Sequence, residues 1–175
     1  MSKSTSRAKI EFGLNIVITI AVVIIAGVLL KRTFFQDQPN HATLEQQAQM
    51  LLGTRINIPG GDWARNRKSL IFFLKKDCVY CEAIAPAYRE LISDSQQFNV
   101  NLIAILPNSV DEGRKYVESL RLPIESVQSG SLASYKIPGT PAVLMVDTEG
   151  IVRGVWFGAE PGRDREMREK LISLL

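Results

Sequence analysis

The 175-residue sequence contains a single histidine and only two cysteines. His41 lies in a polar stretch far along the chain from both cysteines, so a histidine-rich metal site cannot be built from this sequence. Two cysteines are also too few for a framework of stabilising disulfides. A c-type haem site would need a histidine directly after the second cysteine, and Glu82 stands there instead. We therefore predict no metal site and no cofactor.

The sequence also lacks an excess of charge of one sign. Its 21 Lys and Arg residues face 18 Asp and Glu residues, which gives a net charge of +3. The basic residues are scattered, without a basic stripe or interleaved aromatic residues. A nucleic acid is therefore not an expected partner.

Residues 12–30 form a long apolar stretch without any charged residue. As a helix with a rise of about 1.5 Å per residue, this stretch can cross a hydrocarbon core of about 30 Å. It is longer than the apolar core of a typical signal peptide, and no small-x-small cleavage motif precedes the Lys31-Arg32 pair. We predict an uncleaved anchor, in which residues 1–11 are a cytoplasmic tail, 12–30 a transmembrane helix and 31–41 a linker.

The remaining residues, 42–175, have the patterns of one domain that alternates helices and strands. Apolar runs indicate buried strands, and apolar residues at helical spacing indicate helices that cover them. A hairpin and a terminal helix beginning at Pro161 follow, which predicts an α/β fold: a mixed sheet with helices on both faces. The expected helices are 42–52, one opened by the cysteine pair, 109–120, a single turn at 132–135 and one from 161; the expected strands are 70–74, 100–106, 142–146 and 151–157; and 59–62 is an expected turn.

The two cysteines form the motif Cys78-Val79-Tyr80-Cys81, directly after the strand 70–74 and a short charged turn. At this spacing on the first turn of a helix, Cys78 lies over unpaired backbone N–H groups at the positive end of the helix dipole, which favours its thiolate. Cys81 lies one turn further in and can attack a disulfide formed by Cys78. We therefore predict a thiol–disulfide oxidoreductase in which Cys78 is the attacking thiol and Cys81 resolves the mixed disulfide.

Three other interpretations of the cysteine pair stay open. The two residues could be small buried hydrophobic side chains, or half of a zinc site, although a closed zinc site usually has four protein ligands. The pair could also be a permanent structural disulfide in a non-catalytic binding module tethered to a membrane. Their position at a strand-to-helix junction favours the redox interpretation.

With these residues, the sequence resembles the thioredoxin superfamily over roughly residues 63–175, and with its anchor it resembles the membrane-tethered, TlpA-type thioredoxin-like reductases. The resemblance implies a thioredoxin-like fold and a cis proline, Pro141, which faces the cysteine pair and shapes a substrate groove with Thr140 beside it. Tyr80, between the cysteines, is expected to be a partly exposed docking surface. The matching features are the strand before Cys78-Val79-Tyr80-Cys81, Pro86 in the helix, Gly139-Thr140-Pro141 before a strand, and Gly158.

Several positions depart from patterns in related proteins. Asp77 stands where many relatives have Trp before the first cysteine, and Phe72 replaces the buried acid of thioredoxin, so the proton shuttle of that protein is absent here. Lys75 stands where a peroxidase of the peroxiredoxin group would have Thr. Lys75 and Lys76 would lower the pKa of the Cys78 thiol, whereas Asp77 would raise it, so the direction of electron flow is left open.

The anchor and the redox pair together suggest a location. The tail carries Lys3, Arg7 and Lys9 against Lys31 and Arg32, which slightly favours a cytoplasmic N-terminus, and disulfides persist outside the cytoplasm. We expect a single-pass protein of the bacterial inner membrane with its C-terminal domain in the periplasm. The expected partners are protein clients, an extracytoplasmic dithiol that resets the pair, and lipid through residues 12–30.

Overall fold

The computed structural model describes residues 41–58 and 67–175. The predicted tail, the transmembrane helix 12–30, nearly all of the linker and the turn at 59–62 lie outside these residues. Among the residues that are described, no helix is long and apolar enough to cross a membrane.

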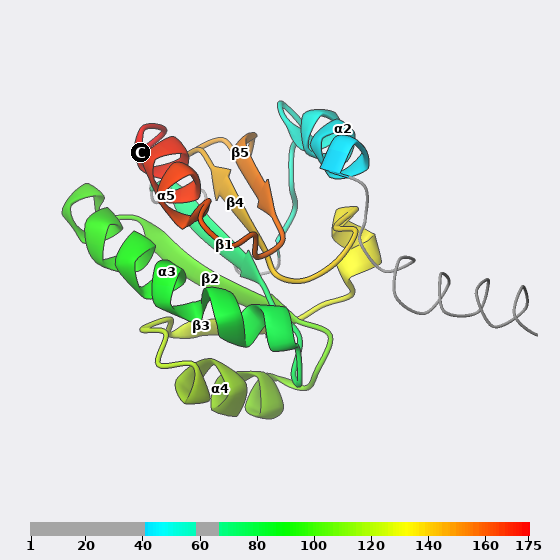
Figure 1. The fold of residues 1–175 in the computed structure, drawn as a ribbon, viewed down its shortest axis with the longest axis vertical. Coiled ribbons are helices and arrows are strands. Elements are labelled where there is room, and N and C mark those ends of the chain that lie inside the picture. The colour runs from blue at the N-terminus through cyan, green and yellow to red at the C-terminus, as the bar shows by residue number, and fades with distance from the viewer. Residues whose placement is uncertain (1–40, 59–66) are drawn as a thin grey trace, which may run out of the picture. The chain divides into compact units, whose positions relative to one another are not determined.

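The domain is built on one five-stranded sheet with the strand order β3-β2-β1-β4-β5 (Figure 1). β1 is parallel to β2, and β2 is parallel to β3. β4 runs antiparallel to both of its neighbours, β1 and β5. The sheet is therefore mixed, as predicted. The strands are β1 (Ser69–Phe73), β2 (Asn101–Leu106), β3 (Ser126–Ser129), β4 (Ala142–Val146) and β5 (Val152–Phe157).

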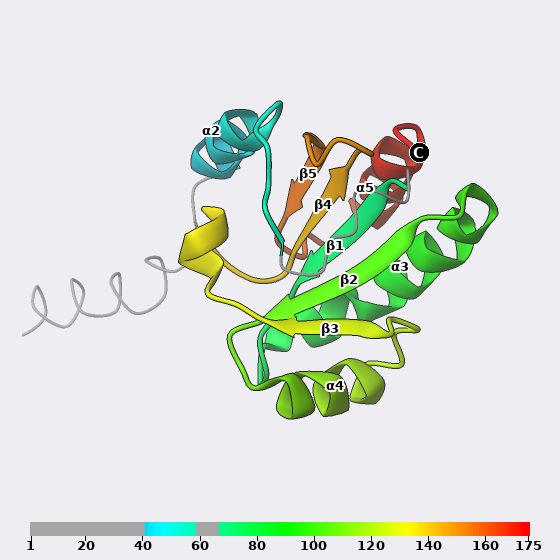
Figure 2. The ribbon, with the colours of Figure 1, turned by 180° about the vertical axis from the view of Figure 1, so that it is seen from behind.

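Helices cover both faces of this sheet, which also confirms the prediction (Figures 1 and 2). One face carries α3, α4 and α5, whose buried residues share a core with Phe72 of β1. The other face carries α2, the segment that follows it and the short helix η3, which share a core with Phe73. The helices are α2 (His41–Leu51), α3 (Val79–Ser95), α4 (Val110–Ser119) and α5 (Asp164–Ile172), with the 3₁₀ turns η2 (Gln96–Phe98) and η3 (Leu132–Tyr135).

The uninterrupted apolar sequence of β1 is explained by the helices that pack on both faces of the sheet. Successive side chains of a strand point to opposite faces, so a strand that is buried on both faces needs apolar residues throughout. Leu70 and Phe72 belong to the core beneath α3, and Ile71 and Phe73 to the core on the other side. All five residues of β1 are buried, which places the turn that follows it at the end of a central, well-fixed strand.

The terminal helix α5 begins later than the sequence predicted. Pro161 and Gly162 form a turn, in which Gly162 has a φ of 84°. This left-handed backbone does not belong to a right-handed helix. The helix therefore begins at Asp164, with Arg163 as its N-cap.

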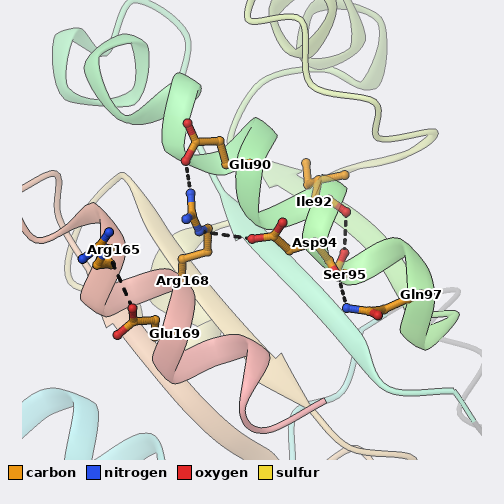
Figure 3. A network of polar contacts seen from close by, with 8 residues as sticks. All are labelled: Glu90, Ile92, Asp94, Ser95, Gln97, Arg165, Arg168 and Glu169. Atoms are coloured by element: carbon orange, nitrogen blue, oxygen red, sulfur yellow. Dashed lines mark hydrogen bonds and ion pairs between the residues drawn. The ribbon is translucent and has the colours of Figure 1, made fainter.

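Side-chain contacts fix α5 against β5 and α3. A Cβ atom added at Gly154 of β5 would lie 2.6 Å from Leu174 Cδ1 and 3.1 Å from Leu171 Cδ2, so only glycine permits this close packing. On its other side, Arg168 of α5 pairs with both Glu90 and Asp94 of α3 (Figure 3). The helix that carries the cysteines is thereby held along its C-terminal half.

Candidate functional site

The cysteine pair lies at the junction between β1 and α3. The charged turn after β1 ends at Asp77, which has a φ of 59°. Aspartate is among the few residues other than glycine that adopt this left-handed conformation at moderate cost. The chain then returns to an extended conformation at Cys78, the N-cap of α3, with φ −97° and ψ 104°. The predicted position of Cys78 at the tip of the helix is confirmed.

Backbone amides of the first helical turn point at Cys78. The N–H of Cys81 donates a hydrogen bond to Cys78 Sγ at 3.2 Å. The carbonyl of Cys78 accepts from the amides of Cys81 and Glu82, at 3.0 and 3.1 Å. A sulfur that accepts from an amide at the positive end of a helix dipole is stabilised as an anion.

Cys78 and Cys81 are joined by a disulfide, with their Cα atoms 5.2 Å apart. Cys81 is completely buried, whereas Cys78 is partly exposed. A partner thiol or disulfide can therefore reach the sulfur of Cys78 but not that of Cys81. This difference in access agrees with the predicted order, in which Cys78 makes the first contact and Cys81 acts from behind it.

The loop before β4 brings Thr140 to Cys78, although the two residues lie 62 positions apart in the chain. Thr140 Oγ1 lies 3.5 Å from Cys78 Sγ, and Thr140 O lies 3.8 Å from the same sulfur. The Thr140–Pro141 peptide bond is cis, as the resemblance implied. The carbonyl of Pro141, which is buried, accepts a hydrogen bond from Gly158 N at 2.8 Å, so the loop after β5 also adjoins the site.

Two apolar side chains between the cysteines are open to solvent. Val79 is 73% exposed and Tyr80 is 57% exposed. Large apolar side chains with this much exposure beside a reactive group offer contact area to a partner. The predicted docking role of Tyr80 remains a prediction, and the exposure of its ring agrees with it.

Among residues 41–58 and 67–175, no carboxylate is buried in the core beneath the cysteines. Phe72 occupies the position at which thioredoxin has a buried acid. Its ring packs edge-on against Tyr88, with 5.0 Å between the ring centroids. Among the described residues, the only buried polar ones are Ser69 and Ser95. Burial raises the pKa of the Tyr88 phenol far above its usual value, so this phenol does not act as a base near neutral pH.

Opposite charges lie close together near the Cys78 loop. The ammonium of Lys76 lies 3.8 Å from Glu112 Oε1 of α4. The charge of Lys76, which was expected to lower the pKa of the Cys78 thiol, is therefore shared with the carboxylate of Glu112. No cluster of potential metal ligands occurs in the described part of the chain.

Sequence reasoning missed Tyr116, which α4 brings to the cysteine loop. Its hydroxyl lies 3.5 Å from the carbonyl oxygen of Cys78, to which it can donate. Burial, followed by the nearby carboxylates of Glu82 and Asp77, raises the pKa of this phenol. The signal that could have found it is helical spacing, because Tyr116 shares the buried face of its helix with Gly113 and Val117.

Comparisons with known proteins agree with this geometry. Residues 53–155 match the AhpC/TSA family, and no curated protein matches the chain in sequence. A putative thiol:disulfide interchange protein DsbE from Chlorobium tepidum is 14% identical with a TM-score of 0.55, and the match covers 70% of this chain and 94% of that one. The thioredoxin domain of a thiol-disulfide oxidoreductase from Bacteroides vulgatus is 16% identical with a TM-score of 0.53, covering 70% and 96%. The fold is therefore thioredoxin-like.

Proposed function

The chain belongs to the AhpC/TSA family, and from this premise we propose that it is a thiol–disulfide oxidoreductase that exchanges disulfides with protein clients through Cys78 and Cys81. One observation carries the proposal: a partly exposed sulfur at the tip of a helix is paired with a fully buried sulfur one turn away. A purely structural disulfide does not need one of its sulfurs to be reachable.

The reaction consists of two exchanges. In the reduced protein, the thiolate of Cys78 attacks one sulfur of a client disulfide; that S–S bond breaks, and the other client sulfur leaves as a thiolate that takes up a proton. Cys81 then loses its proton and attacks Cys78 Sγ, the mixed disulfide breaks, and the second client sulfur leaves. Two electrons have passed to the client, and the Cys78–Cys81 disulfide has formed.

The cycle is completed by an external dithiol, which reduces the pair by the same steps in reverse. Amides at the start of α3 stabilise Cys78 as the attacking and leaving group. The hydroxyl of Thr140, 3.5 Å from Cys78 Sγ, adds a further donor. Tyr80 on the first turn of α3 is 57% exposed, so a client segment bound at Cys78 could contact it. Thr140 contacts the sulfur from the loop before β4, and the cis Pro141 follows it directly.

Two serine variants test the assigned order. Cys78→Ser is expected to abolish the reduction of insulin disulfides, because the only other cysteine, Cys81, is completely buried. Cys81→Ser is expected to accumulate mixed disulfides with clients, because the resolving thiol is missing. Equal trapping by both variants would contradict the order. A pair that cannot be reduced and reoxidised reversibly in the wild-type protein would favour the non-catalytic module instead.

We further propose that residues 12–30 anchor the protein in the bacterial inner membrane, with the redox domain in the periplasm. The support is the uncharged apolar run and the basic residues of the N-terminal tail. Fusion of a reporter that is active only in the periplasm after Leu175 is expected to give activity. Activity of a reporter that works only in the cytoplasm would contradict this orientation.

A further inference from the structure

One stripe of α4 touches the loop that carries the attacking cysteine. Asn108, Glu112 and Tyr116 follow one another at intervals of four residues, which places them along one side of the helix and of the turn that leads into it. Asn108 Oδ1 accepts from the backbone N–H of Lys76 at 3.4 Å, Glu112 lies 3.8 Å from the Lys76 ammonium, and Tyr116 Oη lies 3.5 Å from the Cys78 carbonyl oxygen. We propose that this stripe, above all Tyr116, positions the Cys78 loop and thereby determines how readily Cys78 reacts.

The loop needs support because its backbone is unusual. Asp77 is held in the left-handed region between the two residues that α4 contacts, Lys76 and Cys78. This conformation is less favourable for aspartate than for glycine, so contacts on both sides of Asp77 help to keep it. Each of the three contacts is long and weak alone, but two come from α4 and the third from the turn that leads into it, and together they hold both neighbours of Asp77. The N-terminal ends of α3 and α4 lie at the same end of the sheet (Figures 1 and 2).

The position of the Cys78 carbonyl affects the Cys78 sulfur through the amide of Cys81. That amide donates to both the carbonyl oxygen and Sγ of Cys78, at 3.0 and 3.2 Å. Tyr116 reaches the same carbonyl oxygen, and its raised pKa keeps the hydroxyl protonated, so that it remains a donor throughout the physiological range. Tyr116 does not touch the sulfur, so it acts as a positioning residue for the amide that does.

The chain offers a matched control for Tyr116. Tyr88 lies in the same core cluster, but its buried hydroxyl has no hydrogen-bond partner in the described part of the chain. Tyr116→Phe and Tyr88→Phe therefore each remove one phenolic hydroxyl from the same core. Only Tyr116→Phe also removes a contact with the cysteine loop. A difference between the two variants isolates that contact from general effects of the substitution.

The measurement is the pH profile of alkylation of Cys78 by iodoacetamide in the reduced full-length protein. Tyr116→Phe is expected to move the midpoint of the profile to higher pH and to slow alkylation at neutral pH by about three- to tenfold, the effect of losing one hydrogen bond. Tyr88→Phe is expected to match the wild-type protein. The charged groups near Cys78, which are Lys76 and Asp77 of its own loop, Glu82 of α3 and Glu112 of α4, are unchanged in both variants.

A second variant keeps the test decisive if Tyr116→Phe does not fold. Asn108→Ala removes the acceptor of the Lys76 amide from an exterior position, and a smaller shift in the same direction is expected. An upward shift in either variant supports the inference, whereas the absence of an upward shift in both overturns it, even if their thermal stability falls.

The inference rests on the proposed function, but the two fail in different ways. An unreactive Cys78 in the wild-type protein contradicts the proposed function. A reactive Cys78 whose alkylation profile is unshifted in the variants contradicts only the role of α4.

Discussion

At the scale of single residues, two identical side chains receive different tasks from their positions on α3. Cys78 is the N-cap, partly exposed and contacted by an amide, and Cys81 is fully buried one turn later. Phe72 removes the acid that could take the proton of Cys81 from inside the core. In the proposed exchange, the proton of Cys81 would therefore pass to a group outside this core, such as the thiolate that leaves the mixed disulfide.

Thr140 provides a prediction at this scale. Its hydroxyl lies 3.5 Å from Cys78 Sγ, where it can donate to the thiolate of the reduced protein. Thr140→Val keeps the shape of the side chain and removes the donor, so alkylation of Cys78 at neutral pH is expected to slow by about two- to tenfold. Thr148→Val, in the turn between β4 and β5, is the control and should leave the rate unchanged. Equal rates for the two variants would show that the Thr140 hydroxyl does not act on the sulfur.

At the scale of elements, the hairpin of β4 and β5 is closed by Asp147. Its carboxylate accepts from the amides of Glu149 and Ile151, each at 2.9 Å, and from Arg153 Nε at 2.7 Å. Partial burial alone would raise the pKa of Asp147, but the hydrogen bonds from Ile151, Arg153 and Glu149 together hold it below its usual value. The turn that precedes β5 is therefore stabilised by a charged group.

This shift has a definite sign in the dependence of stability on pH. A carboxyl group with a lower pKa in the folded state stabilises the fold above its unfolded-state pKa of about 3.9, and this contribution is lost as the pH falls through the folded-state pKa. Asp147→Asn is expected to lower the free energy of unfolding at pH 7 and to reduce its decline in acid. Urea unfolding at pH 7 and at pH 3 measures both effects, with Glu149→Gln as the control. A decline in acid as steep as that of the wild-type protein would contradict the assignment.

The link between α3 and α5 provides a second prediction for elements. Arg168, which is 29% exposed, pairs with Glu90 and Asp94 across the two helices, whereas the pair of Arg165 and Glu169 lies within one helix and is more than 70% exposed on both sides. Arg168→Ala is expected to lower the free energy of unfolding by about 1 kcal/mol, because it breaks a network and removes packing. Arg165→Ala should change it by less than about 0.5 kcal/mol.

Urea unfolding measures both arginine variants, and alkylation of Cys78 provides the check on function. Arg168 contacts the C-terminal half of α3, away from the cysteines at its N-terminal end (Figure 3). The rate of alkylation should therefore stay unchanged in Arg168→Ala. A loss of stability in Arg165→Ala as large as in Arg168→Ala would mean that the bridge between the helices adds nothing.

At the scale of the whole molecule, every contact described at the site comes from the unit His41–Leu175. The contacts with Lys76 and Cys78 come from α4, from Asn108 in the turn that precedes it, and from the loop before β4. A fragment of residues 41–175 is therefore expected to fold and to be alkylated at Cys78 at the same rate as the full chain in detergent. Slower alkylation of the folded fragment would show that the first forty residues contribute to the site.

The class of fold and the type of chemistry could be predicted from the sequence, because both depend on patterns within short segments. Apolar runs and helical spacing predicted most of the strands and the helices, and the spacing of Cys78 and Cys81 on one helical turn predicted their separate roles. Resemblance added the cis bond at Pro141. The start of the last helix was wrong by a few residues, because the left-handed backbone at Gly162 ends the continuity that Pro161 suggested.

The surroundings of the Cys78 sulfur depend on contacts between distant segments. Tyr116 lies 38 positions from Cys78 and Asn108 lies 32 positions from Lys76; helical spacing can mark Tyr116 as a buried residue of α4, but no local pattern shows which distant residue it meets. Their meeting depends on the packing of α4 against α3 over the sheet, which is settled by the burial of apolar area in the whole domain rather than by any one segment. The sequence predicted which sulfur attacks first, and the packing of α4 determines which residues lie beside its loop.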